Sequence, residues 1–136
     1  ILYYRILNYI KMSTTLKTFN IQLVNFATVL SERFPSNKSL RLGVTAIETL
    51  KEYNPKKNIE IFNQYAYQYK EIIINKDETA LLTTDFTSTV NTDKGEAHNI
   101  MDTLRENWVS LDEDEKENMW KYLKVLVILC DKYRTE

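Results

Sequence analysis

The amino-acid sequence predicts an all-α protein, and three observations support this fold class. The 136 residues include only two glycines and two prolines, fewer than the turns of a β-sandwich or a Rossmann-like fold require. Apolar residues recur at steps of three and four along most of the chain, as they do on one face of a helix. The C-terminal stretch begins with acids and ends with bases, which suits the dipole of a long helix. We therefore expect one domain, residues 12–136, built as a bundle or orthogonal array of about five helices.

The longest expected helix spans residues 112–134. Asp112 suits its N-cap position, and Glu115 follows at the spacing of a capping box. Its main face carries apolar side chains at steps of three and four: Met119, Leu123, Leu126, Cys130 and Tyr133, widened by Trp120 and Val127. Val125 and Ile128 lie off this face, so the helix is apolar nearly all round. We expect such a helix to be central and packed on more than one side.

Two helices are expected in the first part of the domain. The first spans residues 15–34, with one of the polar residues 13–15 as its cap and Pro35 as its stop. The second spans residues 39–53 and contains Gly43, which would permit a close helix crossing at some cost in helix propensity.

The third expected helix runs from Pro55 to about residue 75. Asn54 is a good N-cap, and proline is favoured at the first helical position. Residues 65–74 also fit a strand, because tyrosines alternate there and three isoleucines follow. Such a strand would have no evident partner in the chain, so we favour the helix.

Residues 79–92 are rich in threonine, which disfavours a long helix, so we expect a loop there with one short turn. Three apolar side chains would pack that turn against the core: Leu81, Leu82 and Phe86. A fourth main helix is expected over residues 93–111. We expect its Trp108 to be buried and to lie near Trp120.

Residues 1–11 precede the first methionine, Met12. We expect them to be an upstream extension that prolongs the first helix and adds nothing essential to the core. This stretch has no small-residue cleavage site of a signal peptide, and it is far shorter than a membrane span.

The acidic residues are concentrated in residues 77–118, which hold 12 acidic and 3 basic side chains, a net charge of −9 against +8 for the rest of the chain. The first interpretation is that this segment lies against basic faces of the first three helices. The second is that its acids stay exposed and attract a basic protein surface. For the second interpretation we predict Glu113, Asp114 and Glu117 as partner-binding residues, at a helix start that projects into solvent.

The sequence indicates no catalytic, cofactor-binding or metal-binding residue, so we expect a protein that is not an enzyme. One cysteine and one histidine exclude an internal disulfide and the His/Cys zinc patterns. Cys130 lies in the most apolar helix, where a thiol is usually inert. His98 and Asp102 are one helical turn apart, and we interpret them as an exposed surface pair. The favoured function is contact with another protein, as an adaptor or scaffold, and we expect no membrane partner.

Weak nucleic-acid binding is the alternative function. It depends on five lysines around the third helix: Lys51, Lys56, Lys57, Lys70 and Lys76. Tyr65, Tyr67 and Tyr69 would stack on bases in this interpretation, although the helical spacing of Tyr65 and Tyr69 favours the core. Proteins that bind phosphate backbones usually have a denser basic patch.

The sequence also shows a weak resemblance to a known group of proteins. The matching segments are Thr15-Leu16-Lys17-Thr18-Phe19-Asn20-Ile21-Gln22-Leu23-Val24-Asn25-Phe26, Lys51-Glu52-Tyr53-Asn54-Pro55, Trp120-Lys121-Tyr122-Leu123 and Leu129-Cys130-Asp131-Lys132-Tyr133. Together they resemble short helical proteins of nucleocytoplasmic large DNA viruses, including those of algae and protists. The resemblance carries no assigned activity and therefore no site residue. It implies an intracellular place of action, in the host cytoplasm or a viral factory, or a place in the virion.

Overall fold

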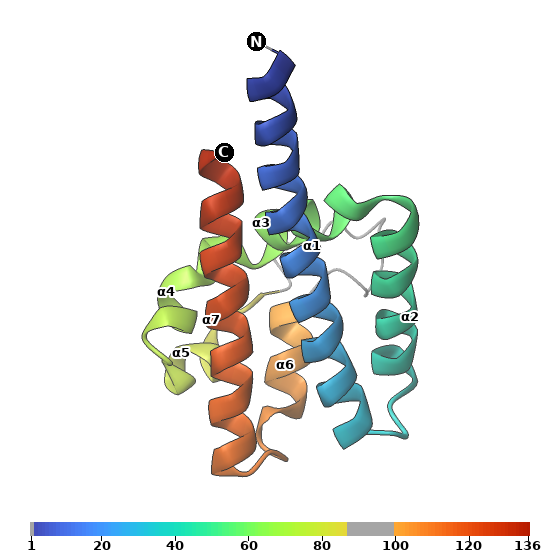
Figure 1. Cartoon of the computed structure of the whole chain (residues 1–136). Helices are drawn as coiled ribbons and strands as arrows, with labels where there is room; N and C mark the ends of the chain where they lie inside the picture. The colour runs from blue at the N-terminus through green and yellow to red at the C-terminus, as the bar shows by residue number, and fades with distance from the viewer. Residues whose placement is uncertain (1, 87–99) are drawn as a thin grey trace.

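The computed structural model describes residues 2–86 and 100–136, and their side chains except those of residues 4–13. Within these ranges the chain is helical and contains no strand, which confirms the predicted all-α class (Figure 1). Seven α-helices and one short 3-10 helix are present there: α1 (Leu2–Arg33), α2 (Lys38–Tyr53), α3 (Pro55–Tyr65), the 3-10 helix (Tyr67–Tyr69), α4 (Lys70–Ile74), α5 (Glu78–Thr83), α6 (Ile100–Trp108) and α7 (Glu113–Thr135).

The two longest helices, α1 and α7, lie side by side and run in opposite directions (Figure 1). Contacts at both ends of α7 fix this arrangement. The Thr15 hydroxyl, near the middle of α1, donates a hydrogen bond to Glu136 (2.8 Å), and Arg33 at the C-terminal end of α1 pairs with Glu115 of α7 (2.6 Å). The helix α2 packs on α1, α4 packs on α7, and α3 contacts both long helices. The α1–α7 pair is therefore the centre of the fold.

The helix α7 begins as predicted. The Asp112 side chain accepts a hydrogen bond from the Glu115 amide (2.8 Å), and the Glu115 side chain accepts one from the Asp112 amide (2.9 Å), which completes the capping box. The predicted apolar face is buried from Met119 to Cys130, whereas Val125 and Ile128 are 40% and 54% exposed. The helix is thus central and packed on more than one side, as expected, but one face remains open to solvent.

Residues 2–11 prolong the first helix, as expected, but the predicted cap of that helix is wrong. The helix α1 is continuous from Leu2, so residues 13–15 lie in its interior and do not cap it. A threonine inside a helix is tolerated when its hydroxyl has another partner, and buried Thr15 has one in Glu136. The end of the helix agrees with the prediction, because α1 stops at Arg33, two residues before Pro35.

Deleting residues 1–11 should change the melting temperature by no more than a few degrees. Residues 2–11 prolong α1, and this part of the helix projects beyond the C-terminal end of α7 in Figure 1. Leu2 and Tyr3 are 71% and 68% exposed. Thermal unfolding followed by circular dichroism checks this expectation. A loss of more than about 10 °C would show that the extension packs into the bundle.

The glycine of α2 does not mark a close helix crossing, which corrects that expectation. A Cβ atom at Gly43 would meet no atom within 4 Å. This helix covers the core only partly, since Leu40 is its buried residue and Ile47 is half-buried at the edge of the core. The glycine therefore supplies flexibility without a packing role.

Replacing Gly43 with alanine should raise the free energy of unfolding by about 1 kcal/mol, because alanine loses less backbone entropy in a helix and meets no neighbour here. A chemical denaturation series measures this change. Ala46→Gly, at an exposed position of the same helix, is the reverse control and should lower stability by a similar amount. A destabilised Gly43→Ala variant would contradict the open environment of this residue.

The third helix is interrupted, and the strand considered at residues 65–74 is absent. The helix α3 ends at Tyr65, and the 3-10 helix follows before α4. The break directs two tyrosines to different partners. The Tyr67 hydroxyl donates a hydrogen bond to Asp131 of α7, and the Tyr69 ring packs edge-on against Phe86 at 4.7 Å. A straight helix over residues 55–75, which we expected, would not provide both contacts.

The threonine-rich segment contains the short helix α5, capped by Asp77, whose side chain accepts from the Ala80 amide (3.0 Å). The expected inward packing is confirmed, because Leu81 and Phe86 are fully buried and Leu82 lies partly buried beside them. The helix expected over residues 93–111 is present from residue 100 to 108 as α6. Residues 87–99 lie outside the described part of the chain.

The two tryptophans are buried against each other, as predicted. Trp108 of α6 is fully buried and Trp120 of α7 is 5% exposed. Their rings meet edge to face with centroids 4.8 Å apart, a favourable geometry for aromatic pairs. This contact joins α6 to the central pair of helices.

Candidate functional site

Most acids at the start of α7 have partners within the molecule. Glu115 pairs with Arg33 of α1, which also donates to the Ser110 carbonyl (2.8 Å). Glu117 pairs with Lys76, which follows α4, at 3.2 Å. These contacts support the first interpretation of the acidic segment, in which it packs against basic residues of the earlier helices.

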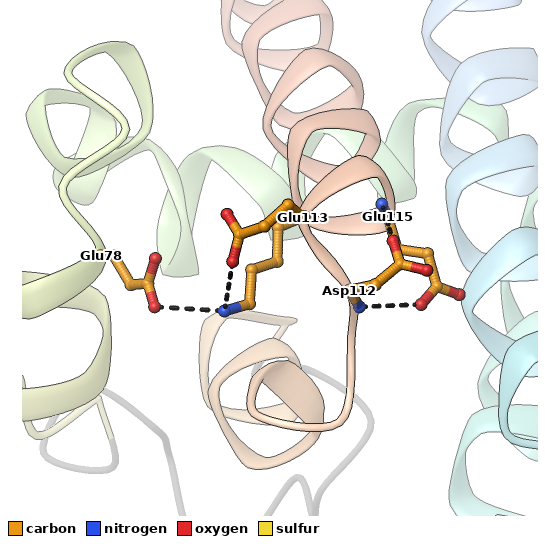
Figure 2. A network of polar contacts seen from close by, with 5 residues as sticks. Glu78, Asp112, Glu113 and Glu115 are labelled. Carbon is orange, nitrogen blue, oxygen red and sulfur yellow. Dashed lines mark hydrogen bonds and ion pairs between the residues drawn. The ribbon is translucent and has the colours of Figure 1, made fainter.

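A lysine of α7 links the same helix start to α5. The Lys116 ammonium lies 3.3 Å from Glu78 and 3.5 Å from Glu113, and Figure 2 shows both carboxylates directed at this one nitrogen. Partial burial acts to lower the pKa of Lys116, but the hydrogen bonds and charges of the two glutamates outweigh it and raise the pKa. The lysine therefore stays charged and holds Glu113 on the α5 side of α7.

The three predicted partner-binding residues consequently differ in their environment. Glu113 and Glu117 have intramolecular partners, whereas Asp114 is exposed and has no ion-pair partner among the described residues. Asp114 shares a shallow, open part of the α7 surface with Glu115, Glu117, Asn118 and Lys121. Of the three acids, Asp114 is the one without an ion-pair partner among the described residues, although the Glu113 side chain is also 89% exposed.

The exposed surface of the central helix pair, which we call the outer face, continues from Asp114 along α7 and α1. On α7, the exposed residues at steps of three and four are Asp114, Asn118, Lys121, Val125, Ile128 and Lys132; on α1 they include Lys17, Ile21, Asn25 and Glu32. Its central apolar residues are Ile21 (38% exposed), Val125 (40%) and Ile128 (54%). These side chains add apolar area to a face that is otherwise polar.

The charges of the outer face are separated along its length. Asp114 and Glu32 lie toward one end, where α7 begins and α1 ends. Lys132 and Lys17 lie toward the other end. All four side chains are exposed, and none forms an ion pair with another described residue. The outer face thus has an acidic end and a basic end, and its exposed apolar side chains lie between them, toward the basic end.

A second polar cluster surrounds Tyr67 on the side of α7 that faces α4. Lys70 donates to the Tyr67 hydroxyl (3.3 Å), and this hydrogen bond is the main cause of the raised pKa of Lys70. The Arg134 guanidinium lies 4.4 Å from the centre of the Tyr67 ring and also donates to Asn63. Since these contacts join α3, the 3-10 helix, α4 and α7, the cluster stabilises the packing of the interrupted third helix.

The residues considered for chemistry have structural environments. Cys130 is buried, and burial raises the pKa of its thiol to about 11, so the thiol stays protonated and unreactive at neutral pH. Asp102 forms an ion pair with Arg105 and thereby raises the pKa of that guanidinium. His98, the proposed neighbour of Asp102, lies outside the described residues.

The tyrosines considered for base stacking are engaged in packing. Tyr65 is buried and Tyr69 packs on Phe86, while Tyr67 has the partners described above. At the corner between α2 and α3, however, Tyr53 is 83% exposed beside the exposed lysines Lys51, Lys56 and Lys57. Its three lysines were among those considered from the sequence, but Tyr53 was not, because it is the last residue of a predicted helix.

Comparisons with known proteins assign no function to the chain, so the proposal below is based on its outer face. No protein-family model matches the chain, and no significant match is found among curated proteins or solved structures. Within the described ranges, no three side chains of the metal-ligating types gather in one place. In the same part of the chain, every helix is too short or too polar to cross a membrane.

The acidic end of the outer face was predicted from the sequence, but its basic end was not. Asp114 was predicted because it lies in an acidic run, whereas Lys17 and Lys132 are isolated charges. The relevant pattern is the spacing of Asp114 and Lys132, which are 18 positions apart, five full turns of an α-helix, and therefore share one side of α7.

Proposed function

We propose that the chain is a non-enzymatic protein-interaction protein of the adaptor or scaffold type, which binds through the outer face of α1 and α7. One observation carries the proposal. The charged groups directed at neighbouring helices are paired, whereas Asp114, Glu32, Lys17 and Lys132 on the outer face flank exposed apolar side chains and form no ion pair with another residue that the structure describes. Charges at the rim of an apolar area direct the approach of a partner and fix its orientation.

Affinity purification from the native cell tests this proposal. Three baits are compared: the wild type, an outer-face variant that carries both Asp114→Lys and Lys132→Ala, and the control variant Glu113→Lys. Glu113 is a neighbouring acid of the same helix start, held toward α5 by Lys116. We expect a protein captured by the wild type and the control but lost with the outer-face variant. If all three baits capture the same proteins, the outer face is not the binding surface.

Weak nucleic-acid binding is the second candidate function, and the α2–α3 corner supports it. An exposed aromatic ring among lysines offers stacking and attraction to phosphate in one place. Nuclease treatment before the purification separates the two functions, because partners held through nucleic acid are then released. Binding of a single-stranded oligonucleotide should also weaken steeply with salt and be lost in Tyr53→Ala; unchanged binding by this variant would remove the corner from consideration.

The place of action is proposed from the resemblance alone. If the chain is related to helical proteins of large DNA viruses, it acts inside the infected host cell or in the virion. Fractionation of infected cells, followed by immunodetection in the cytoplasm, viral factories and purified virions, would test this.

A further inference from the structure

We propose that the partner of the outer face is a second copy of this chain, docked in the opposite direction. This inference rests on the proposed function, because it uses the same surface. A twofold axis lying across the two helices would place α7 on α7 of the copy and α1 on α1 of the copy, each pair antiparallel. The acidic end of each outer face then meets the basic end of the other.

The two long helices point to the same axis independently. On α7, Asp114 of one copy meets Lys132 of the other when the axis passes near Leu123, which lies midway between them. On α1, Glu32 meets Lys17 of the copy when the axis passes near Asn25. An axis that satisfies only one helix would leave the charges of the other mismatched.

The packing of the monomer brings these two midpoints level with each other. The Phe26 ring of α1 and the Tyr122 ring of α7 are in edge-to-face contact, with centroids 5.9 Å apart. Each of these residues lies next to one of the midpoints. A single twofold axis therefore pairs Asp114 with Lys132 and Glu32 with Lys17, each twice across the contact. The charges of the outer face are thus complementary to those of an identical face.

Exposed apolar side chains lie on one side of the midpoint of the proposed contact. Ile128 and Val125 lie beyond the midpoint of α7, so in the antiparallel arrangement Val125 is opposite Lys121 of the copy. The alkyl part of Lys121 can cover the valine while its ammonium reaches solvent. Asp114 and Lys132 are about 27 Å apart along the helix, so the contact is of modest size and the dimer should be reversible, with a Kd in the micromolar range.

A purely basic partner fits this surface less well than a second copy. The basic end of the outer face would repel such a partner, since Lys17 and Lys132 are exposed there. A surface that is acidic at one end and basic at the other is best matched by a partner whose basic end meets the acidic one. An antiparallel copy of the same surface meets this condition.

Sedimentation equilibrium of the purified full chain at low ionic strength tests the proposal. The wild type should show a monomer–dimer equilibrium that weakens with added salt. Asp114→Lys places two lysines opposite each other and should raise Kd at least tenfold, as should Lys132→Glu. The chain carrying both changes restores opposite charges at both contacts, so its Kd should return to within about threefold of the wild type. Glu113→Lys should dimerise as the wild type does, and circular dichroism checks that every variant is folded.

Two results would overturn the second-copy inference. The first is a wild-type chain that stays monomeric at a chain concentration of about 1 mM, because the Kd of the dimer would then be millimolar or weaker. The second is a dimer that Asp114→Lys and Lys132→Glu leave unchanged, which would place the contact on another face. A monomeric chain that still captures another protein through Asp114 and Lys132 would leave the proposed function standing. A monomeric chain without any such capture would overturn both.

Discussion

Replacing Trp120 with alanine should lower the free energy of unfolding by about 3–5 kcal/mol, the usual cost of removing a buried tryptophan. The side chain is 5% exposed, and its ring packs edge to face on Trp108 with centroids 4.8 Å apart. The substitution removes apolar area from the core and leaves a cavity between α6 and α7. Urea denaturation followed by far-ultraviolet circular dichroism measures the change.

Ile128→Ala is the matched control for this prediction. It truncates a large apolar side chain on the same helix, but at a position that is 54% exposed, so the loss should stay below about 1 kcal/mol. Trp120→Phe keeps an aromatic ring against Trp108 and should cost less than the alanine substitution. If Trp120→Ala also costs less than about 1 kcal/mol, Trp120 is not part of the core, and an exposed tryptophan would then be a candidate contact residue.

The elements that sequence analysis located best are those whose ends are defined by local chemistry. The capping box of α7 requires two residues three positions apart, and Pro35 and Pro55 restrict the backbone at fixed points. The cap predicted at residues 13–15 was wrong, because Thr15 lies inside α1 and its hydroxyl is satisfied by Glu136, a contact 121 positions away in the chain. The break after Tyr65 has the same origin, since the hydrogen bond between Tyr67 and Asp131 is tertiary.

The candidate site shows a similar limit. Composition identified an acidic segment, and the helix start at Asp112 identified which acids lie at a helix end. Whether each acid is paired depends on Arg33, Lys76 and Lys116, whose positions follow from the packing of α1, α4 and α7. The separation of opposite charges along the outer face became visible only when two helices distant in sequence were placed side by side.

Two buried asparagines form the polar contact that we expect to matter most for the arrangement of α1, α2 and α3. Asn20 and Asn58 are 2% and 3% exposed. The Asn58 amide donates to the Asn20 side-chain oxygen (2.8 Å) and to the Ile47 carbonyl of α2 (3.1 Å). The Asn20 amide donates to the carbonyls of Leu16 and Pro55, both at 3.0 Å. Three helices thus share one hydrogen-bonded group in the core.

Replacing Asn20 with leucine should lower the free energy of unfolding by about 3 kcal/mol. The change removes the acceptor of the Asn58 amide and the donor to Pro55, and each buried polar group left without its partner costs about 1–3 kcal/mol. Asn58→Leu should have a similar effect, because it removes the link to α2 as well. Urea denaturation at low protein concentration measures both variants.

The variant with both asparagines replaced by leucine should cost clearly less than the two single changes combined, by at least about 1 kcal/mol, since no side-chain amide is then left unpaired. Gln64→Leu, at an exposed amide of the same helix as Asn58, is the control and should change stability by less than about 0.5 kcal/mol. Additive losses in the double variant would show that the two asparagines stabilise the fold separately. A coupled loss means that the pair selects one arrangement of α1 against α2 and α3, because sliding α1 by one turn would separate Asn20 from Asn58.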